Sequence, residues 1–587
     1  MCRTFTYSVL SNPLRERRTF VASRVSYGGY TFLFQILTTS NAYTAEFSAP
    51  VQEGERLVYC TQEVSYGDDS GRVAALFEVS FSSSLKSVSW QARAEHSEQI
   101  KGIKVFVESL PYGKVVTPPG LRWEISESAG QCFVYPHGAY PVRGRGGETG
   151  IVFPVGPIPG MAAQFILIEG EEETVCIRAN EHPPRFKRFW AYRAEEGLEV
   201  HLMSEENAFE LSNEYSSPTW HIDRVSSWEE AVDPYIEWME EVYELEPLES
   251  RRDVPEWLRR VAFMAILHGV TSDGKMCHNF AEMEARLHEL AQVFPSERTL
   301  IKVLGHEGRV DYHVPDNLPG EELGGPEGFA RFMTSAHALG FKVLVHMNVW
   351  GMALDHPLYP QFEQHQIHDL FGRPVFWEVD YDKDENIEPT FAYISPDAPE
   401  FRKLMVDCIG RLVNDYAIDA FHLDQSAFPI NDLHHDHMRG VGLLFEELQA
   451  AYPGVLFTGE GTSEWVAGMY ALSSGQGEIL WIDMELGHDG SRLDELVNSE
   501  MYRRLLGKYM LSYGSSGSIG PEPRRGVWTF PHPRIWWSER KFRAWQDFFE
   551  RLDVIPTLVL TDKHVKTDSA LARLVLDRAE QWLERSS

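Results

Sequence analysis

Hydrophobic and polar positions alternate with a period of two through the first third of the chain. Between residues 18 and 203, short apolar runs are broken by Gly, Pro, Asn and Ser, as in YTFLFQILTT (30–39) and VAALFEVSFS (73–82). Successive side chains of a strand point to opposite faces, so this pattern predicts strands with one buried face. We therefore expect residues 1–203 to form a large antiparallel β-sandwich.

The pattern changes over residues 204–254. The segment SSWEEAVDPYIEWMEEVYEL (226–245) begins with serines and early glutamates, and its apolar positions recur at helical spacing. These features are typical of a capped helix. We interpret 204–254 as a helical linker between two domains.

From residue 255 to 587 the pattern alternates between strands and helices, which is typical of a parallel sheet built from βα units. The expected strands are 261–269, 299–305, 342–349, 418–424, 455–460, 478–483, about 510–519, and 554–560. Helices are expected between them, among them 279–294, 327–340 and 399–416. Eight such strands predict a (β/α)8 TIM barrel. An open doubly wound sheet is less favoured, because no Gly-rich phosphate loop follows the first strand.

Two carboxylates end successive strands of this predicted barrel. Asp424 follows AIDAFHL, and Glu460 follows VLFTG 36 positions later. The carboxyl ends of barrel strands open onto one face, so both acids should meet in one pocket. Two facing carboxylates are what the cleavage of a glycosidic bond requires, one as nucleophile or base and the other as acid.

Further polar residues stand at or just beyond the ends of strands 2 to 6, and we expect them to contact the substrate. They are His306, Asp311, His346, Asn348, Trp350, His422 and Asp483. His268, by contrast, is interpreted as a satisfied core residue. Long polar segments at 306–326 and 350–398 should shape the pocket on the same face.

The motifs AFHLDQS and FTGEG, with VLVHMNVWG upstream, resemble the α-amylase superfamily of glycoside hydrolases, family 13. The segment GHEGRVDYHVPDNLPGEELGG and the β-rich N-terminal part resemble family 101, the endo-α-N-acetylgalactosaminidases, and its uncharacterised bacterial relatives. The resemblance implies a glycosidase with Asp424 as nucleophile and Glu460 as general acid/base. It also implies that Asp311, His346 and Asn348 contact sugar hydroxyls. His422 stands where amylases place an arginine, so starch is not the expected substrate.

The sequence leaves several alternatives open beside a retaining hydrolase of an α-linked neutral sugar. In an enzyme resembling the α-galactosidase clan, Asp483 would be the acid/base and Glu460 would support it. A transglycosylase would use the same residues, and a catalytically inactive carbohydrate-binding barrel protein is the alternative outside enzymes. Under the favoured assignment Asp424 is ionised and Glu460 protonated, since proximity raises the pKa of one acid of a pair.

The composition of the chain narrows the classes of binding partner that we expect. The formal net charge of −33 disfavours nucleic acid and anionic membranes, so the expected partner is an oligosaccharide or glycoside, with a homo-oligomer left open. Six scattered cysteines predict neither disulfides nor a zinc site, and we expect no metal and no cofactor. The run HHDH (434–437) is interpreted as a polar loop. With no signal peptide or membrane segment visible, we expect a cytoplasmic protein.

Overall fold

The computed structural model forms two units, one from Met1–Tyr135 and Ala163–Trp238 and the other from Pro136–Ala162 and Met239–Ser587. It describes residues 24–66, 71–128, 130–136, 161–271, 274–370, 372–379, 388–474, 492–514, 539–560 and 566–586. Strands β15 (Ser212–Ser216) and β16 (Trp220–Val225) pair with the sheet of the first unit, although they lie in the stretch expected to be a linker. The division into 1–203, 204–254 and 255–587 stays a prediction.

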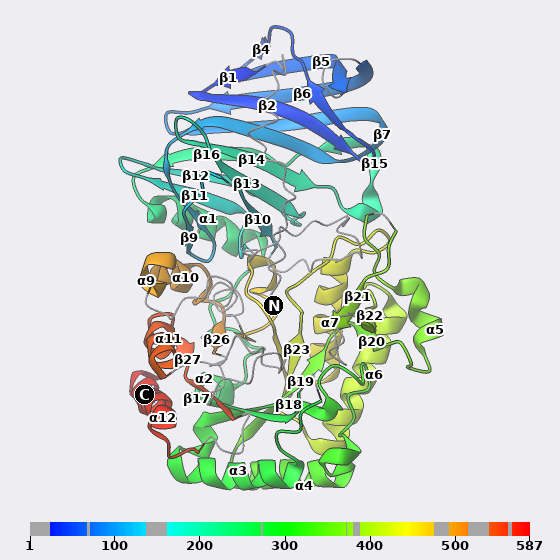
Figure 1. Ribbon diagram of the computed structural model, residues 1–587, viewed down its shortest axis with the longest axis vertical. Helices are drawn as coiled ribbons and strands as arrows, with labels where there is room; N and C mark the ends of the chain where they lie inside the picture. Colours follow the sequence, from blue (N-terminus) through cyan, green and yellow to red (C-terminus); the bar gives the residue numbers. More distant parts are fainter. Residues whose placement is uncertain are drawn as a thin grey trace, which may run out of the picture. The chain divides into compact units, whose positions relative to one another are not determined.

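In the described part of the first unit, sixteen strands form one antiparallel sheet. Its centre is β7 (Ser87–Leu110), which pairs with β2, β6, β14, β15 and β16 (Figure 1). The remaining strands are β1 (Val25–Tyr27), β2 (Tyr30–Thr38), β3 (Ala42–Ala45), β4 (Val51–Glu53), β5 (Arg56–Tyr66), β6 (Gly71–Ser83), β8 (Gly113–Thr117), β9 (Leu121–Trp123), β10 (Gln131–Tyr135), β11 (Phe165–Gly170), β12 (Thr174–Ala179), β13 (Lys187–Arg193) and β14 (Leu198–Glu205).

The alternation read from the sequence corresponds to burial in these strands. In β2 every second side chain is buried, among them Phe32, Phe34 and Ile36. The ring of Phe32 lies 5.0 Å from that of Phe81 and 5.1 Å from that of Trp90. Aromatic contacts between strands thus fill the interior that the pattern predicted.

Helix α1 (Trp228–Val242) occupies most of the predicted helix 226–245. Its first turn is capped by a carboxylate, because the backbone N–H and the hydroxyl of Ser226 both donate to Glu230. None of the described helices combines the length and the hydropathy needed to cross a membrane.

The second unit contains a nearly closed parallel sheet. Its strands, in spatial order, are β27 (Val554–Ile555), β26 (Leu511–Tyr513), β25 (Leu472–Ser473), β24 (Leu456–Gly459), β23 (Ala420–Asp424), β19 (Lys342–Asn348), β18 (Thr299–Arg309), β17 (Phe263–Val270) and β28 (Thr557–Leu560). This sheet and the antiparallel one are consistent with the predicted TIM barrel and β-sandwich.

The two ends of this sheet belong to one segment of chain. β27 pairs with β26 and β28 pairs with β17, and only Pro556 separates β27 from β28. Proline has no N–H to donate to a ladder. The side chain of Thr557 partly replaces the missing bond: its hydroxyl accepts from Gly514 N at 3.2 Å and donates to Ile555 O at 2.8 Å.

The sixth strand differs from the prediction. The expected strand 478–483 lies outside the described residues, and β25 pairs with β24 and β26 at Leu472–Ser473 instead. With only two residues, β25 is too short to show any hydrophobic period. The predicted seventh strand is found as β26, within its expected limits of about 510–519.

Helices flank the parallel strands in Figure 1: α6 and α7 lie to the right of them, α3 and α4 below, and α11 and α12 to the left. The helices described in this unit are α2 (Glu256–Arg259), α3 (Phe280–Val293), α4 (Gly325–Leu339), α5 (Tyr359–Phe362), α6 (Pro399–Tyr416), α7 (His437–Ala451), α9 (Leu493–Leu496), α10 (Ser499–Leu506), α11 (Glu539–Arg551) and α12 (Ala570–Ser586). Within the segment 350–398, expected to be a long loop, a small sheet forms from β20 (Gly351–Ala353), β22 (Glu388–Tyr393) and β21 (Phe376–Val379).

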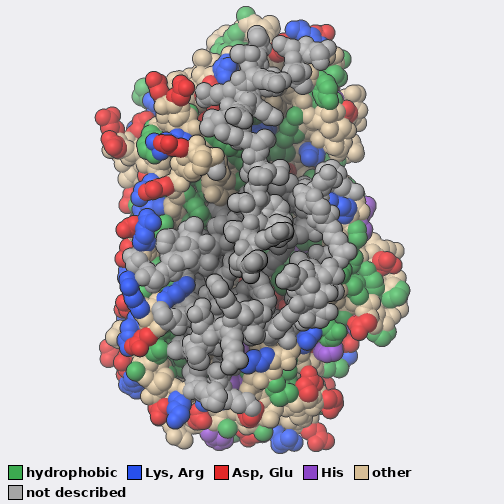
Figure 2. Space-filling view, viewed as in Figure 1, with side chains coloured by type: hydrophobic (Ala, Val, Ile, Leu, Met, Phe, Trp, Pro, Cys, Tyr) green, Lys and Arg blue, Asp and Glu red, His purple; other side chains and the backbone are tan. Residues whose placement is uncertain are grey.

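Acidic and basic side chains are intermingled over the described part of the face drawn in Figure 2. Many form ion pairs, such as Arg543 with Glu539 and Lys403 with Asp407 on exposed helix faces. Exposed pairs of this kind contribute little to stability. The basic residue of each pair does, however, offset part of the protein's excess negative charge locally.

A pair of glycines in α7 tests how closely this helix packs on the segment before α6. A Cβ on Gly440 would lie 2.2 Å from the backbone N of Asp397, whereas a Cβ on Gly442 would meet no atom closer than 3.8 Å. We expect Gly440→Ala to lower the free energy of unfolding by about 1–3 kcal/mol through overpacking. Gly442→Ala should raise it by about 0.5–1 kcal/mol, because alanine favours the helix. Urea unfolding of both variants checks this, and equal effects of the same sign would contradict the packing described.

Candidate active site

Asp424 and Glu460 meet at the carboxyl ends of neighbouring strands. β23 and β24 pair in parallel with Leu423 opposite Gly459, which places the two acids side by side. Their carboxyl groups are close enough to share a hydrogen bond. The Asp424 side chain keeps 16% of its surface exposed, and Glu460 is partly exposed. Both acids can therefore be reached by a ligand.

Hydrogen bonds between the residues that follow β23 and β24 fix the position of Glu460. Gln425 N donates to Glu460 Oε2 at 2.9 Å, and Glu460 N donates to Ser426 Oγ at 3.0 Å. Gln425 has a φ of 64°, a left-handed backbone conformation that residues other than glycine rarely adopt. The turn that fixes Glu460 therefore stores backbone strain directly beside Asp424.

Asn348 and Trp350, predicted to contact the substrate, stabilise this turn. Asn348 Nδ2 donates to Gln425 Oε1 at 3.0 Å, and Trp350 Nε1 donates to the same oxygen at 3.1 Å. Asn348 Oδ1 accepts from the backbone of Trp350 and Gly351. Both side chains are fully buried, so they lie behind the acids rather than on the surface of the pocket.

The environment places the shared proton differently from the prediction. Burial raises the pKa of Asp424 well above its usual value, and the nearby Glu460 and Asp311 add to this effect, opposed by Lys302. We expected Glu460 to be the protonated acid of the pair. The raised pKa of Asp424 instead favours the proton on Asp424.

His346 and Asp311 are brought to the same place from β19 and from the segment after β18. His346 Nδ1 lies 4.0 Å from Asp424 Oδ1, and His346 Nε2 lies 3.4 Å from Asp311 Oδ1. Within the described structure, neither ring nitrogen of His346 has a hydrogen-bond partner. Asp311 Oδ1 has none either. Buried polar atoms without partners are costly, and a ligand's hydroxyl groups would satisfy them.

Behind Asp424 lies Lys302, a residue that the sequence analysis did not single out. Lys302 Nζ donates to the Tyr513 hydroxyl at 2.7 Å, and this hydroxyl lies 3.1 Å from His422 Nδ1. His422 Nε2 in turn lies 3.6 Å from Asp424 Oδ1. The signal for Lys302 was a charged residue inside the apolar run TLIKVLG. Burial lowers the pKa of Lys302 to about 8, and burial likewise lowers the pKa of His422 well below its usual value.

The other predicted residues lie elsewhere. His306 is fully buried, with Nε2 2.9 Å from Asn317 O and Nδ1 3.1 Å from Glu307 Oε2. Asp483 lies outside the described residues. His268, expected to be a satisfied core residue, is buried, but neither of its ring nitrogens has a hydrogen-bond partner in the described structure.

The HHDH run helps to fold its own loop. Asp436 accepts from Arg439 N at the start of α7, and His437 Nδ1 accepts from Ile430 N at 3.0 Å. His435 Nδ1 lies 2.7 Å from Asp432 Oδ2. The run is therefore only in part the expected polar loop, because Asp436 caps α7 and the buried His437 is the first residue of that helix.

Within the described residues, one group of side chains has the spacing of metal ligands. One ligand atom each from His346, His422 and Asp424 lies within 4.8 Å of the others. The cationic Lys302 acts electrostatically on both His422 and Asp424. A positive charge at this position opposes the binding of a second cation.

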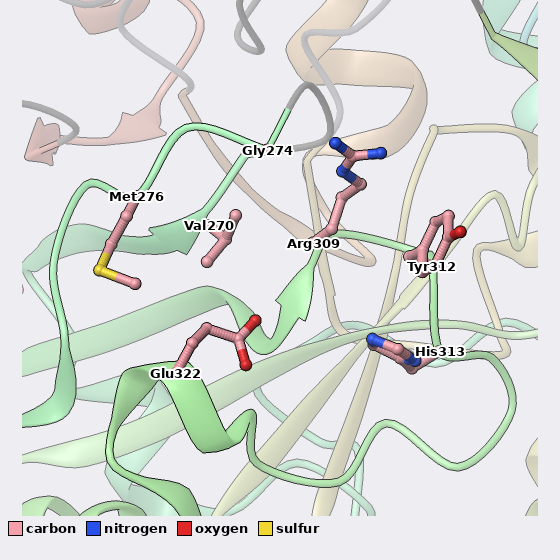
Figure 3. A pocket seen from close by; sticks show the side chains of 7 residues that line it. All are labelled: Val270, Gly274, Met276, Arg309, Tyr312, His313 and Glu322. Carbon is pink, nitrogen blue, oxygen red and sulfur yellow. The ribbon is translucent and has the colours of Figure 1, made fainter. Parts of the chain in front are cut away.

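A pocket of about 400 Å³ opens beside the segment that carries Asp311. Figure 3 shows its lining at the ends of β17 and β18, with Arg309, Tyr312 and Glu322 around the space. Tyr312 and Met276 are exposed large hydrophobic side chains. An aromatic surface among charged groups is suited to a sugar ring and its hydroxyls.

Comparison with known proteins points to a class of folds. A family model described as "Domain of unknown function (DUF6259)" matches residues 215–452. No curated protein matches this chain.

Solved structures resemble the chain over nearly its full length. The ligand-free α-N-acetylgalactosaminidase NagBb from Bifidobacterium bifidum is 12% identical and covers 96% of this chain and 93% of its own, with a TM-score of 0.62. The α-galactosidase TtGalA from Thermus thermophilus, in complex with p-nitrophenyl α-D-galactopyranoside, is 12% identical and covers 87% of this chain and 93% of its own, with a TM-score of 0.51. At this identity the likeness shows a shared fold. The names of both neighbours describe glycosidases, and neither name is that of an α-amylase-like enzyme.

The raised pKa of Asp424 has a consequence for stability. A carboxyl group whose pKa is higher in the folded state destabilises that state once the pH exceeds its unfolded value near 4. We expect Asp424→Asn to raise the free energy of unfolding by about 1–3 kcal/mol at pH 8 and by much less at pH 4. Denaturant unfolding at both pH values measures this.

Asp419, at the opposite end of β23, provides the matched control. Its pKa is lowered: although burial alone would raise it, hydrogen bonds from His337, Lys342 and Val343 N outweigh that effect. Asp419→Asn should therefore lower stability at pH 8, and the loss should fade toward pH 3. If both variants changed stability in the same direction at pH 8, the electrostatic account of Asp424 would be wrong.

Proposed function

We propose that this protein is a glycoside hydrolase that cleaves an α-linked neutral sugar with retention of configuration. Asp424 is the nucleophile and Glu460 the general acid/base. The observation that carries the proposal is the contact of two accessible carboxyl groups at the ends of successive parallel strands. The fold shared with two α-glycosidases supports it.

The closeness of the carboxyl groups favours retention over inversion. Inverting enzymes keep their carboxyl groups about 6.5–9.5 Å apart to admit a water molecule, whereas retaining enzymes keep them about 5–5.5 Å apart. Side chains close enough to share a hydrogen bond are nearer to the retaining arrangement. Binding of a sugar between them would separate the pair and leave one proton for the leaving group.

Proton placement requires one step before the reaction. Asp424 must be ionised to attack the anomeric carbon, and Glu460 must carry the proton that the leaving oxygen receives. In the ligand-free site the proton is favoured on Asp424. We therefore propose that substrate binding moves it to Glu460, which is hydrogen-bonded to the Gln425 backbone.

The remaining groups would bind the sugar. His346 and Asp311 offer buried, unpartnered polar atoms to its hydroxyls, and the pocket of Figure 3 would take the part beyond the cleaved bond. The structural neighbours include NagBb in complex with GalNAc. Aryl α-N-acetylgalactosaminides and aryl α-galactosides are therefore the first substrates to test. The barrel and sandwich, and the domain limits 1–203 and 255–587, belong to this proposal.

The catalytic pair is tested by two substitutions with different signatures. We expect Asp424→Asn to lower release of the aryl leaving group by at least about 10³-fold, whatever the leaving group, because no glycosyl-enzyme forms. Glu460→Gln should slow substrates with poor leaving groups by about 10²–10⁴-fold and activated ones far less, because only the former need the proton. Product stereochemistry followed by NMR would report retention.

Asp483→Asn is the informative comparison for Glu460→Gln. If the dependence on the leaving group follows Asp483 instead, the acid/base is Asp483, as in the α-galactosidase-like alternative. A wild-type protein that turns over no aryl α- or β-glycoside, yet binds sugars equally well with Asp424→Asn, would leave the inactive carbohydrate-binding protein as the conclusion.

A further inference from the structure

The described residues place one cation, Lys302, deep among the strands beneath the carboxyl pair. Lys302 is 5% exposed and lies on β18. In the sheet, β19 lies between β18 and β23. Asp424, Glu460 and Asp311 all act electrostatically on Lys302. A buried lysine without a function in binding or charge balance would be costly. Its neighbours indicate what it does.

Lys302 reaches Asp424 through two other side chains. An ammonium group only donates, so the Tyr513 oxygen accepts its hydrogen bond at 2.7 Å. The Tyr513 hydroxyl can then donate its own proton to His422 Nδ1 at 3.1 Å. This assignment places the His422 proton on Nε2, which faces Asp424 Oδ1 at 3.6 Å. That last separation exceeds a hydrogen bond and acts as a charge–dipole contact.

We propose that Lys302, Tyr513 and His422 form a relay of positioning residues that favours the ionised form of the Asp424 carboxyl group, and so helps its proton to pass to Glu460 when substrate binds. This inference rests on the proposed function. Each member presents the positive end of its polar bond toward the next, so the relay transmits the charge of Lys302 to the nucleophile. Without it, Asp424 would hold the proton of the carboxyl pair more firmly and would be ionised for attack in a smaller fraction of the molecules.

The relay works against a crowded set of ionisable groups. Those that act on Asp424 or contact it come from several elements: Asp311 after β18, Lys302 on β18, His346 on β19, Tyr393 on β22, His422 on β23, Glu460 after β24 and Tyr513 on β26. Burial keeps Tyr393 and Tyr513 neutral by raising the pKa of each phenol well above its usual value. The acids favour a proton on Asp424, and Lys302 opposes them.

The first test is a pH profile of kcat/KM with whichever aryl α-glycoside the wild type hydrolyses. We expect Lys302→Met to move the acidic limb upward by about one pH unit, because Asp424 then ionises at higher pH. Tyr513→Phe should move it in the same direction by less, since the charge remains. Tyr509→Phe is the matched control: this buried phenol donates to Glu240 at 2.6 Å, away from the relay, and the limb should stay in place. An unmoved limb in Lys302→Met would overturn the proposal.

The second test does not need activity. Lys302→Met and Asp424→Asn are combined in a double-mutant cycle of denaturant unfolding at pH 7. Asp424→Asn should increase stability more when Lys302 is absent, because the charge on Asp424 is then unopposed. Equal gains in both backgrounds would overturn the relay, even in an active enzyme. Coupled gains in a protein without glycosidase activity would keep the electrostatic link and refute the proposed function.

Discussion

The site depends on holding three carboxyl groups close together, although their negative charges repel one another. Asp424, Glu460 and Asp311 are gathered at one end of the parallel sheet, and the structure compensates with one buried ammonium and with backbone donors. Such crowding costs folding free energy, which is the usual condition of groups whose proton affinity must be tuned. The strained backbone of Gln425 and the buried amide of Asn348 are part of the same compensation, because they fix the turn that supplies one of those donors.

Most of the fold could be predicted from the sequence because the two hydrophobic periods differ so clearly. Alternation identified strands such as β2, and apolar runs followed by helical patterns identified β17, β18, β19, β23 and β24. The sixth strand was not predicted at its actual place, since two residues cannot display a period. The sheet inside 350–398 was missed because its polar, proline-containing segments resemble loop sequence.

The site was only partly predictable, because the sequence indicates where a residue lies along a strand but not the direction in which its side chain points. Asp424 and Glu460 follow from the rule that strand ends share one face. Whether a residue beyond a strand end turns toward the pocket depends on the following turn, so the inward burial of Asn348 and Trp350 could not be read. Lys302 escaped notice because a strand buried on both faces shows no alternation that would mark which residues point inward.

The interruption at Pro556 affects more than the closing of the sheet. β26 and β27 share only two residue pairs, and one of them sets Tyr513 opposite Ile555. Tyr513 therefore stands at a weakly paired junction of the sheet, with the hydroxyl of Thr557 bridging the break beside it. Any ligand, temperature change or neighbouring segment that loosens this junction would displace the phenol, so that local opening of the late strands becomes a means of adjusting acidity three strands away.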